Sequence, residues 1–371
     1  MPTTSGTPTS SPAPTQSPDY STSGAFNGTG IALATQSFGQ GTFGTVVVYF
    51  QHWTGQIRYM QLDSYGSWRG GDESTIVATN ARNGTPIAAV AYAMNEISTW
   101  HIFYIDKDNT LQEKINGNTT NLWLDGPLGS YGFQAMDDPN VGLQGCWAGY
   151  RPGDQINAIP IQGSEDQNYT SSSQTLGISL WYGATPTRLQ SVGWTFGTET
   201  WGEKERLDGF NGHAGIGCYS WGPGTVTYLM ASDLSNTVNI WWKDLNSTGK
   251  ENSTHPIETW TNSSVAIPNS FQNTSLGYTS HLYSQDSELN LVGYNVSWNA
   301  ENTAFVPGDE FEIEGDQGLA GTHMSVTAVP SDSGGESLLV FNQIEGDSIT
   351  VFTRDIEQGQ WTSAVLPLPQ Q

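Results

Sequence analysis

Two groups of carboxylates are the side chains in this sequence that could do chemistry by their spacing alone. Their members are Glu199, Glu203, Glu205 and Asp208 in the first group, and Asp309, Glu310, Glu312 and Glu314 in the second. Paired carboxylates can act as acid and base in glycoside cleavage, and clustered ones can bind a cation. We interpret both groups as acidic surface loops, because no other feature of a catalytic or metal site accompanies them.

Motifs of the common catalytic centres are absent from the sequence. It contains no HExxH, no GxSxG and no P-loop, and its six histidines show no metal-ligand spacing. We therefore expect a protein that is not an enzyme, with no catalytic residue, no bound metal and no cofactor. A glycoside-processing enzyme is kept as the least favoured alternative.

Tryptophan recurs at the end of similar segments. The residues are Trp68 (GSW), Trp123 (NLW), Trp201 (ETW), Trp260 (ETW) and Trp361 (GQW). The first two are 55 residues apart, and the last gap, of 101 residues, corresponds to two units. Repeats of this length built from short strands are typical of propellers and solenoids.

Each repeat contains an inner strand of small apolar residues, a second and a third strand, and a poorer outer strand. The inner strands are predicted at IALATQSF, PIAAVAYA, GLQGCWAGY, AGIGCYSW, GYTSHLYS and HMSVTAV. Six units of four antiparallel strands predict an all-β, six-bladed β-propeller over residues 27–371. Unit three carries a polar insertion at roughly residues 151–174, and the fifth unit lacks a terminal Trp. A pair of β-sandwiches is the alternative fold.

Composition limits the classes of partner. The 371 residues include 43 Gly but only 13% charged residues, which favours short strands and tight turns. The net charge is −24, from 12 Lys and Arg against 36 Asp and Glu, so phosphate backbones would be repelled. We expect no nucleic-acid partner. No apolar run is long enough for a membrane span, so a membrane anchor is expected only upstream.

Asn-X-Ser/Thr sequons favour the secretory route and a secreted or cell-surface glycoprotein. Nine occur, at Asn27, Asn83, Asn118, Asn168, Asn246, Asn252, Asn262, Asn273 and Asn295. Residues 1–26 are rich in Ser, Thr and Pro and are expected to form a disordered stalk. They lack the basic and apolar regions of a signal peptide, so we expect that a leader or anchor has been removed.

Cys146 and Cys218 are the two cysteines and occupy matching places in adjacent repeats. A disulfide that joins two inner strands is one interpretation. Two separate buried thiols are the other, because Cys often fills a small space in a core.

The units resemble those of the fungal fucose-specific lectin family, which are six-bladed propellers. The resemblance is carried by VYFQ…GQIR…GSWRGG, DKDNTLQE…LW, PIAAVAY and VFNQ…GQWTSAV, and it covers about residues 30–368. It implies binding of glycans or glycoproteins, with fucose or a related sugar as ligand. It also implies a possible homodimer, because family members often pair.

The resemblance further implies sugar sites between neighbouring blades. In the family, an Arg near the start of the second strand and a Glu in the third strand bind the hydroxyls, and aromatic rings of the next blade cover the apolar face. The Arg place holds Val47, His101, Ser179, Thr227, Asn290 and Leu339 in this sequence. The Glu place holds Tyr59, Glu113, Ser191, Ile240, Phe305 and Val351.

Only the second unit keeps a carboxylate, and no unit keeps the Arg. The resemblance therefore implies one remaining ligand-binding site, between units two and three, formed by His101, Glu113, Trp194 and Trp201. Histidine is expected to bind a sugar more weakly than Arg does, because imidazole has fewer hydrogen-bond donors than guanidinium. Binding is thus expected to be weak, dependent on pH, or directed at another sugar.

Two functional hypotheses follow. The first is an extracellular carbohydrate-binding propeller with few working sites. The second is a propeller that has lost sugar binding and acts as a protein-interaction or adhesion ectodomain, which the missing Arg and the insertion in unit three favour.

Overall fold

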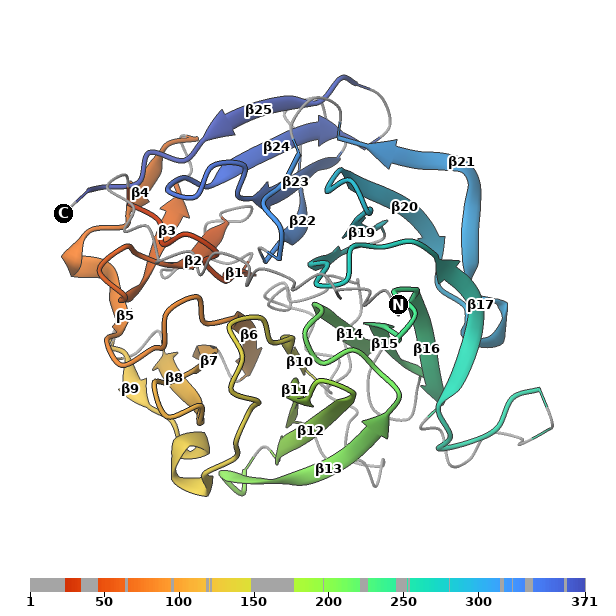
Figure 1. Ribbon diagram of the computed structural model, residues 1–371. Coiled ribbons are helices and arrows are strands. Elements are labelled where there is room, and N and C mark those ends of the chain that lie inside the picture. Colours follow the sequence, from red (N-terminus) through yellow and green to blue (C-terminus); the bar gives the residue numbers. More distant parts are fainter. Residues whose placement is uncertain are drawn as a thin grey trace, which may run out of the picture.

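The chain forms a six-bladed β-propeller in a computed structural model, as predicted from its repeats (Figure 1). The residues that the structure describes are 24–34, 46–63, 66–94, 97–117, 120, 122–147, 177–195, 197–220, 226–244, 252, 254–279, 281–313, 317–321, 323–330, 336–356 and 359–370. The expected insertion at 151–174 and residues 1–23 of the expected stalk lie outside them. Gly24 to Phe26 contact the propeller, where Ala25 pairs with His52 and is fully buried.

Within each blade the strands are antiparallel and follow chain order from the axis to the rim. The first three blades consist of β1 (Ile31–Ala34), β2 (Val47–Gln51), β3 (Ile57–Leu62) and β4 (Trp68–Gly70), with β5 (Ile76–Ala78) also paired to β3; β6 (Ile87–Met94), β7 (Ile97–Ile105), β8 (Leu111–Gly117) and β9 (Leu124–Asp125); and β10 (Leu143–Trp147), β11 (Gly177–Thr185), β12 (Arg188–Thr195) and β13 (Thr200–Asp208).

The last three blades repeat the same plan. They consist of β14 (Ile216–Ser220), β15 (Val226–Ser232), β16 (Val238–Asp244) and β17 (Thr261–Ile267); β18 (Leu276–Tyr278), β19 (His281–Gln285), β20 (Leu291–Ser297) and β21 (Ala304–Glu312); and β22 (Ser325–Pro330), β23 (Glu336–Asn342), β24 (Thr350–Asp355) and β25 (Thr362–Val365).

Blade 5 differs from its predicted strands. The stretch GYTSHLYS, predicted as one inner strand, forms parts of the two short strands β18 and β19. The connection between these two strands is so short that the run of strand-forming residues is hardly interrupted in the sequence. Every later strand of this blade therefore lies one place further out than predicted: the segment 303–314 contributes the outer strand β21 and not the third.

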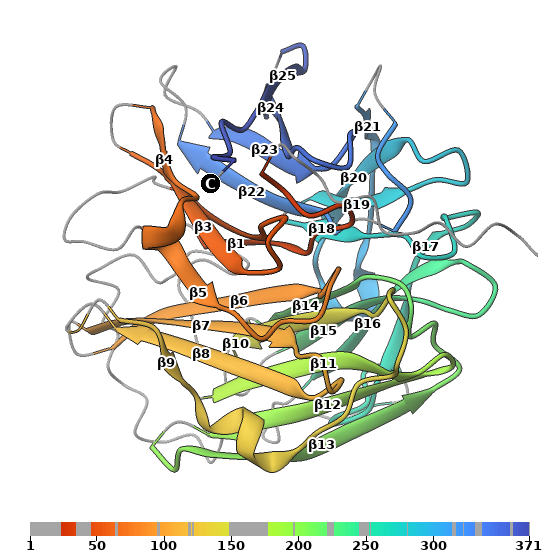
Figure 2. The ribbon, with the colours of Figure 1, turned by 60° about the vertical axis from the view of Figure 1, so that its left-hand side comes forward.

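The ring closes through contacts between the innermost strands of neighbouring blades, including β1 with β22 (Figure 2). Glycines permit this approach. A Cβ atom on Gly30 would lie 2.5 Å from the backbone nitrogen of Ile87, and one on Gly215 would lie 2.6 Å from that of Leu276. Six apolar clusters fill the six junctions between blades, so burial is divided into small cores around the ring.

A glutamine at or just beyond the end of the second strand links some blades to the next one. Gln51 donates to the carbonyl oxygen of Arg82, and Gln285 donates to that of Leu319. Gln343 joins blade 6 to blade 1, because its oxygen accepts from the backbone N–H of Thr29 and its amide donates to Phe26 O. The second-strand endings YFQ (residues 49–51) and FNQ (residues 341–343) thus indicate where one blade is linked to the next.

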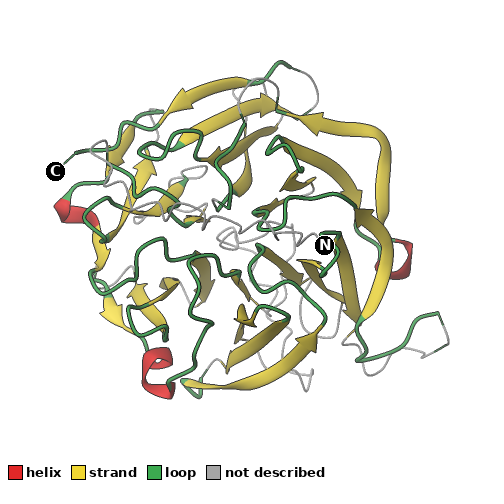
Figure 3. Cartoon of the chain, viewed as in Figure 1, coloured by secondary structure: helices red, strands yellow, loops and turns green. Residues whose placement is uncertain are grey.

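The spacing predicts that the recurring tryptophans end the blades. In the structure they lie instead at the start of the outer strands or just before it. Trp68 begins β4 and Trp201 is the second residue of β13, while Trp260 and Trp361 come immediately before β17 and β25. Short 3₁₀ helices lie at the rim (Figure 3), among them η2 (Pro127–Tyr131) and η4 (Ala300–Asn302). No helix among the described residues is long and apolar enough to cross a membrane.

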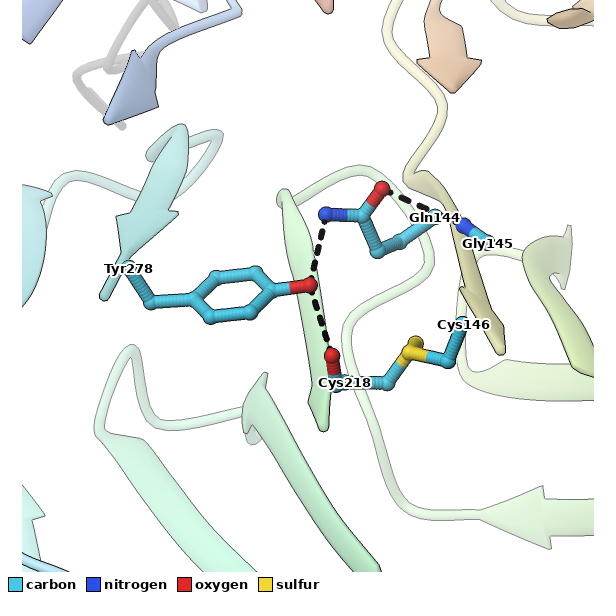
Figure 4. Close-up of a disulfide and its surroundings, with 5 residues drawn as sticks. All are labelled: Gln144, Gly145, Cys146, Cys218 and Tyr278. Carbon is cyan, nitrogen blue, oxygen red and sulfur yellow. Dashed lines mark hydrogen bonds between the residues drawn. A yellow bond between two sulfur atoms is a disulfide. The ribbon is translucent and has the colours of Figure 1, made fainter. Parts of the chain in front are cut away.

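Cys146 and Cys218 form a disulfide between the inner strands β10 and β14, with their Cα atoms 5.9 Å apart. Tyr278 of the next blade extends this link (Figure 4). Its hydroxyl donates to the carbonyl oxygen of Cys218 at 2.6 Å and accepts from the Gln144 amide at 2.9 Å. Blades 3, 4 and 5 are therefore tied together near the axis, and of the two interpretations of the cysteines the bonded one is correct.

Candidate functional site

His101 and Glu113 meet in blade 2 on the face that packs against blade 3. The imidazole Nδ1 lies 2.7 Å from Glu113 Oε1. The two residues belong to β7 and β8, where Phe103 pairs with Glu113 and His101 precedes Phe103 by two positions. Side chains two apart on a strand point to the same face, so the register brings both into one junction.

Trp201 reaches the same carboxylate from blade 3. Its indole Nε1 donates to Glu113 Oε2 at 3.2 Å, and the backbone N–H of Leu128 in η2 donates to the same oxygen at 3.2 Å. A Cβ atom on Gly126 would lie 2.3 Å from Glu113 Oε2, so η2 begins directly against the carboxylate. Glu113 thus has partners from blade 2, η2 and blade 3.

Trp194 completes the predicted set, with its ring centroid 5.4 Å from that of His101. Two aromatic residues that the sequence does not single out join it. Tyr92 stacks on Trp147 at 4.3 Å and its hydroxyl lies 3.3 Å from His101 Nε2. Burial raises the pKa of Tyr92 well above its ordinary value, so the phenol that contacts the imidazole stays protonated.

The four predicted residues therefore converge, but in a closed arrangement. Exposure is 1% for His101 and Glu113 and 4% for Trp194 and Trp201. Both imidazole nitrogens and both carboxylate oxygens already have partners within the protein. In this geometry the residues hold blades 2 and 3 together.

One contact of this junction recurs around the ring. An aromatic residue of the second strand meets the outer-strand Trp of the following blade edge to face, with centroids 5.6–6.4 Å apart and ring planes at 75–89°. The pairs are Tyr49 with Trp123, Phe103 with Trp201, Trp181 with Trp260, Tyr283 with Trp361, and Phe341 with Trp68. These pairs give five of the six junctions between blades a common geometry, and the junction between blades 4 and 5 is not among them.

This common geometry corrects the positions expected in blade 5, and core packing corrects one position in blade 4. In blade 5, Tyr283 pairs with Gly293, so His281 occupies the place of His101 and Gly293 that of Glu113, in place of Asn290 and Phe305. In blade 4, Tyr228 faces the following blade and occupies the place predicted for Thr227. The shift in blade 5 follows from the misplaced strands, and Arg still fills neither place.

The junction between blades 3 and 4 holds a carboxylate that we expected in an acidic surface loop. Ser191 fills the Glu place there, but it pairs with Glu205 on the outer strand β13. Glu205 accepts a hydrogen bond from Trp260 Nε1 and forms an ion pair with Lys243. Glu205 is therefore not part of an acidic loop, and it occupies the role that Glu113 has one junction earlier.

This second junction is more open than the first. The side chains of Glu205 and Lys243 are 28% and 14% exposed, and Trp260 is half-buried. The Lys243 ammonium lies 4.9 Å from the centroid of the Trp260 ring. A carboxylate, a cation and an indole are thus gathered at the surface, which is the set of groups that binds a sugar's hydroxyls and its apolar face. Among the described residues no cluster could hold a metal ion.

Comparisons with known proteins agree with this architecture. Residues 26–144 match the model of the fungal fucose-specific lectin family. A fucose-specific lectin of Aleuria aurantia is 26% identical over 195 residues, which cover 52% of this chain and 54% of that protein. The match thus spans about half the length of this relative. The predicted resemblance to the family is confirmed.

Solved structures show the same fold. The six-bladed propeller lectin of Aleuria aurantia has a TM-score of 0.65 at 19% identity, covering 95% of this chain and 98% of that one. A mutant of it in complex with α-methyl-L-fucoside has a TM-score of 0.65 at 20% identity, covering 93% and 97%. AofleA of Arthrobotrys oligospora has 0.63 at 14%, covering 94% and 88%. Together these comparisons show the six-bladed propeller fold and a similarity to the fungal fucose-specific lectin family.

Proposed function

We propose that this chain is a lectin-like propeller that binds fucose or a related sugar of a glycan at the junction between blades 3 and 4. The observation that carries the proposal is the partly exposed group of Glu205, Lys243 and Trp260. The similarity to fucose-specific lectins supports the class of ligand.

Each of the three side chains has a distinct task in the proposed complex. Ionised Glu205 accepts hydrogen bonds from sugar hydroxyls, since a carboxylate has more lone pairs than Trp260 and Lys243 occupy. Lys243 has a flexible stem, so its ammonium can leave the indole ring and donate to a hydroxyl. The freed ring then packs against the C–H groups of the pyranose.

In this proposal the four residues expected to bind the sugar, His101, Glu113, Trp194 and Trp201, do not contact it. Its polar atoms are engaged and its side chains are nearly inaccessible. Sugar contact there would require blades 2 and 3 to separate locally. We assign these residues to the stability of the junction and the working site to the next junction.

A glycan array with matched variants tests the assignment. Wild type is compared with Glu205→Gln, Trp260→Ala and the control Glu203→Gln, an exposed carboxylate of the same strand β13. We expect the signal to fall at least tenfold in the first two variants and to stay unchanged in the control. An unchanged signal in Glu205→Gln and Trp260→Ala would contradict the site.

The array also separates the two functional hypotheses. If wild type gives no signal at high density, and a single protein captured from extracts stays bound in free sugar, the protein-interaction ectodomain is correct and sugar binding is wrong. Thermal melting of each variant shows whether a loss of signal reflects unfolding.

We further infer that the protein acts outside the cell as a secreted or cell-surface glycoprotein. The Cys146–Cys218 disulfide supports an oxidising compartment. Four sequon asparagines are exposed for a glycan, namely Asn27, Asn83, Asn252 and Asn262. Mass spectrometry before and after glycosidase treatment tests this, and unmodified asparagines in protein from its natural source would oppose it.

A further inference from the structure

His255 joins blade 4 to blade 5 through two carboxylates. Its Nε2 lies 2.7 Å from Asp244 Oδ2, at the end of β16, and its Nδ1 lies 2.6 Å from Glu301 Oε2, in η4. The imidazole also packs on Trp242, with ring centroids 4.9 Å apart. Among the described residues, Asp244 and Glu301 are the charged groups in contact with it.

This geometry requires a protonated imidazole. A neutral imidazole has one N–H donor, whereas ionised carboxylates only accept, so two such contacts need both nitrogens to carry protons. The hydrogen bonds to Asp244 and Glu301 accordingly raise the pKa of His255 above its ordinary value. The three residues form a bridge that exists only with the imidazolium.

The bridge and the proposed sugar site lie on opposite faces of β16 and are connected through the chain. Asp244 directly follows Lys243 in the chain, and the segment that contains His255 leads to Trp260. The segment is held to the same strand by its backbone, where Glu258 N–H donates to Asp244 O at 2.8 Å and Ile257 pairs with Asp244. Anchoring His255 on Asp244 therefore fixes the path that delivers Trp260 to Glu205.

We propose that His255 is a positioning residue for the sugar site, and that its protonated form holds Trp260 in place against Glu205. The proposal rests on the proposed function of that site. Glycan affinity then falls as pH rises through the pKa of His255, because a neutral imidazole leaves one carboxylate facing a lone pair. Below that pH the bridge is complete and affinity is highest.

Glu301→Gln separates this proposal from a merely structural role. Its side-chain amide can donate to Nδ1 of a neutral imidazole while Nε2–H still donates to Asp244, so the bridge survives deprotonation. We expect wild type to lose about tenfold in glycan affinity between pH 6 and pH 9. Glu301→Gln should lose less than twofold, and the matched control Glu288→Gln, an exposed carboxylate elsewhere in blade 5, should behave as wild type.

Two readouts distinguish failure of the bridge from failure of the sugar site. The first is the NMR titration of His255, assigned with His255→Gln, whose midpoint should lie above the ordinary histidine range in wild type and fall in Glu301→Gln. The second is amide hydrogen exchange of residues 254–260, which should accelerate at high pH beyond the intrinsic pH effect in wild type only. Neither needs a ligand, so both decide the bridge even if no glycan binds.

An ordinary titration midpoint, or equal exchange behaviour in wild type and Glu301→Gln, would overturn the bridge. A bridge that titrates as expected while affinity stays constant with pH would overturn its positioning role.

Discussion

Trp201 donates its indole N–H to Glu113 across the junction between blades 2 and 3. Trp260 repeats this contact with Glu205 one junction later, although Glu205 comes from the outer strand and Glu113 from the third. The carboxylate is buried at the first junction and partly exposed at the second. We infer that the same contact stabilises the first junction and is available to a ligand at the second.

Glu113→Ala should destabilise the protein by about 1–3 kcal/mol for each buried group left unpaired, because His101 and Trp201 lose their common hydrogen-bond partner. The measurement is denaturant unfolding at neutral pH. Glu203→Ala, which removes an exposed carboxylate from β13, is the control and should change stability by less than about 0.5 kcal/mol. Equal stabilities of the two variants would show that Glu113 does not hold the junction.

Gly126→Ala should cost about 1–3 kcal/mol through overpacking, because the new Cβ atom would lie 2.3 Å from Glu113 Oε2. Gly202→Ala is a matched control, since a Cβ atom at Gly202 meets nothing within 4 Å. Thermal melting of both variants checks this. A melting temperature for Gly126→Ala as high as that of the control would contradict the tight approach of η2.

Cys146→Ser should lower stability by about 4 kcal/mol in the chain-entropy estimate, since the disulfide closes a loop between residues 72 positions apart. Reduction of wild type should give a similar loss. The comparison is the denaturant midpoint of oxidised wild type, reduced wild type and the variant. A midpoint that does not depend on reductant would contradict a stabilising disulfide.

Acid should favour the contact between blades 4 and 5. The pKa of His255 is raised in the folded protein by Asp244 and Glu301, so its contribution is complete below the unfolded value, about 6.5, and is lost as pH rises through the folded one. The melting temperature of wild type should therefore exceed that of His255→Gln at pH 5.5. The difference should vanish at high pH, and a difference that grows with pH would have the wrong sign.

The C-terminal segment should help to close the ring. Leu366 is buried in the cluster between blades 6 and 1, and Trp53 donates its indole N–H to Gln370 O at 3.0 Å. Removal of residues 366–371 should therefore lower the melting temperature by several degrees. Removal of Gln371 alone is the control, and equal melting of the two truncated forms would contradict a role in closure.

The repeats predicted the fold because each blade must place apolar strands in the same order to fill its junction. Where a connection is very short, as between Tyr278 and His281, the pattern did not show the turn and the later strands were displaced. The sequence showed that one Trp recurs in most blades. It did not show that this Trp lies at the start of the outer strand, because that depends on how the strands pair and not on their spacing.

The candidate site was predicted in part for a related reason. His101, Glu113, Trp194 and Trp201 do converge, because strand register and blade order fix their positions. Their burial depends on η2 and on Tyr92, which no motif marks. Glu205 was assigned to an acidic surface loop, because nothing in the sequence distinguishes it from its acidic neighbours. Its contact with blade 4 depends on the pairing of its outer strand with Ser191.

The affinity of Glu205→Gln for the best glycan of the array, measured by isothermal titration at pH 6, tests the central claim most directly. Hydrogen bonds to a charged group contribute about 1.5–3 kcal/mol, so we predict a dissociation constant at least tenfold higher than in wild type. An affinity equal to that of wild type in a folded Glu205→Gln variant would contradict a sugar site at the junction of blades 3 and 4.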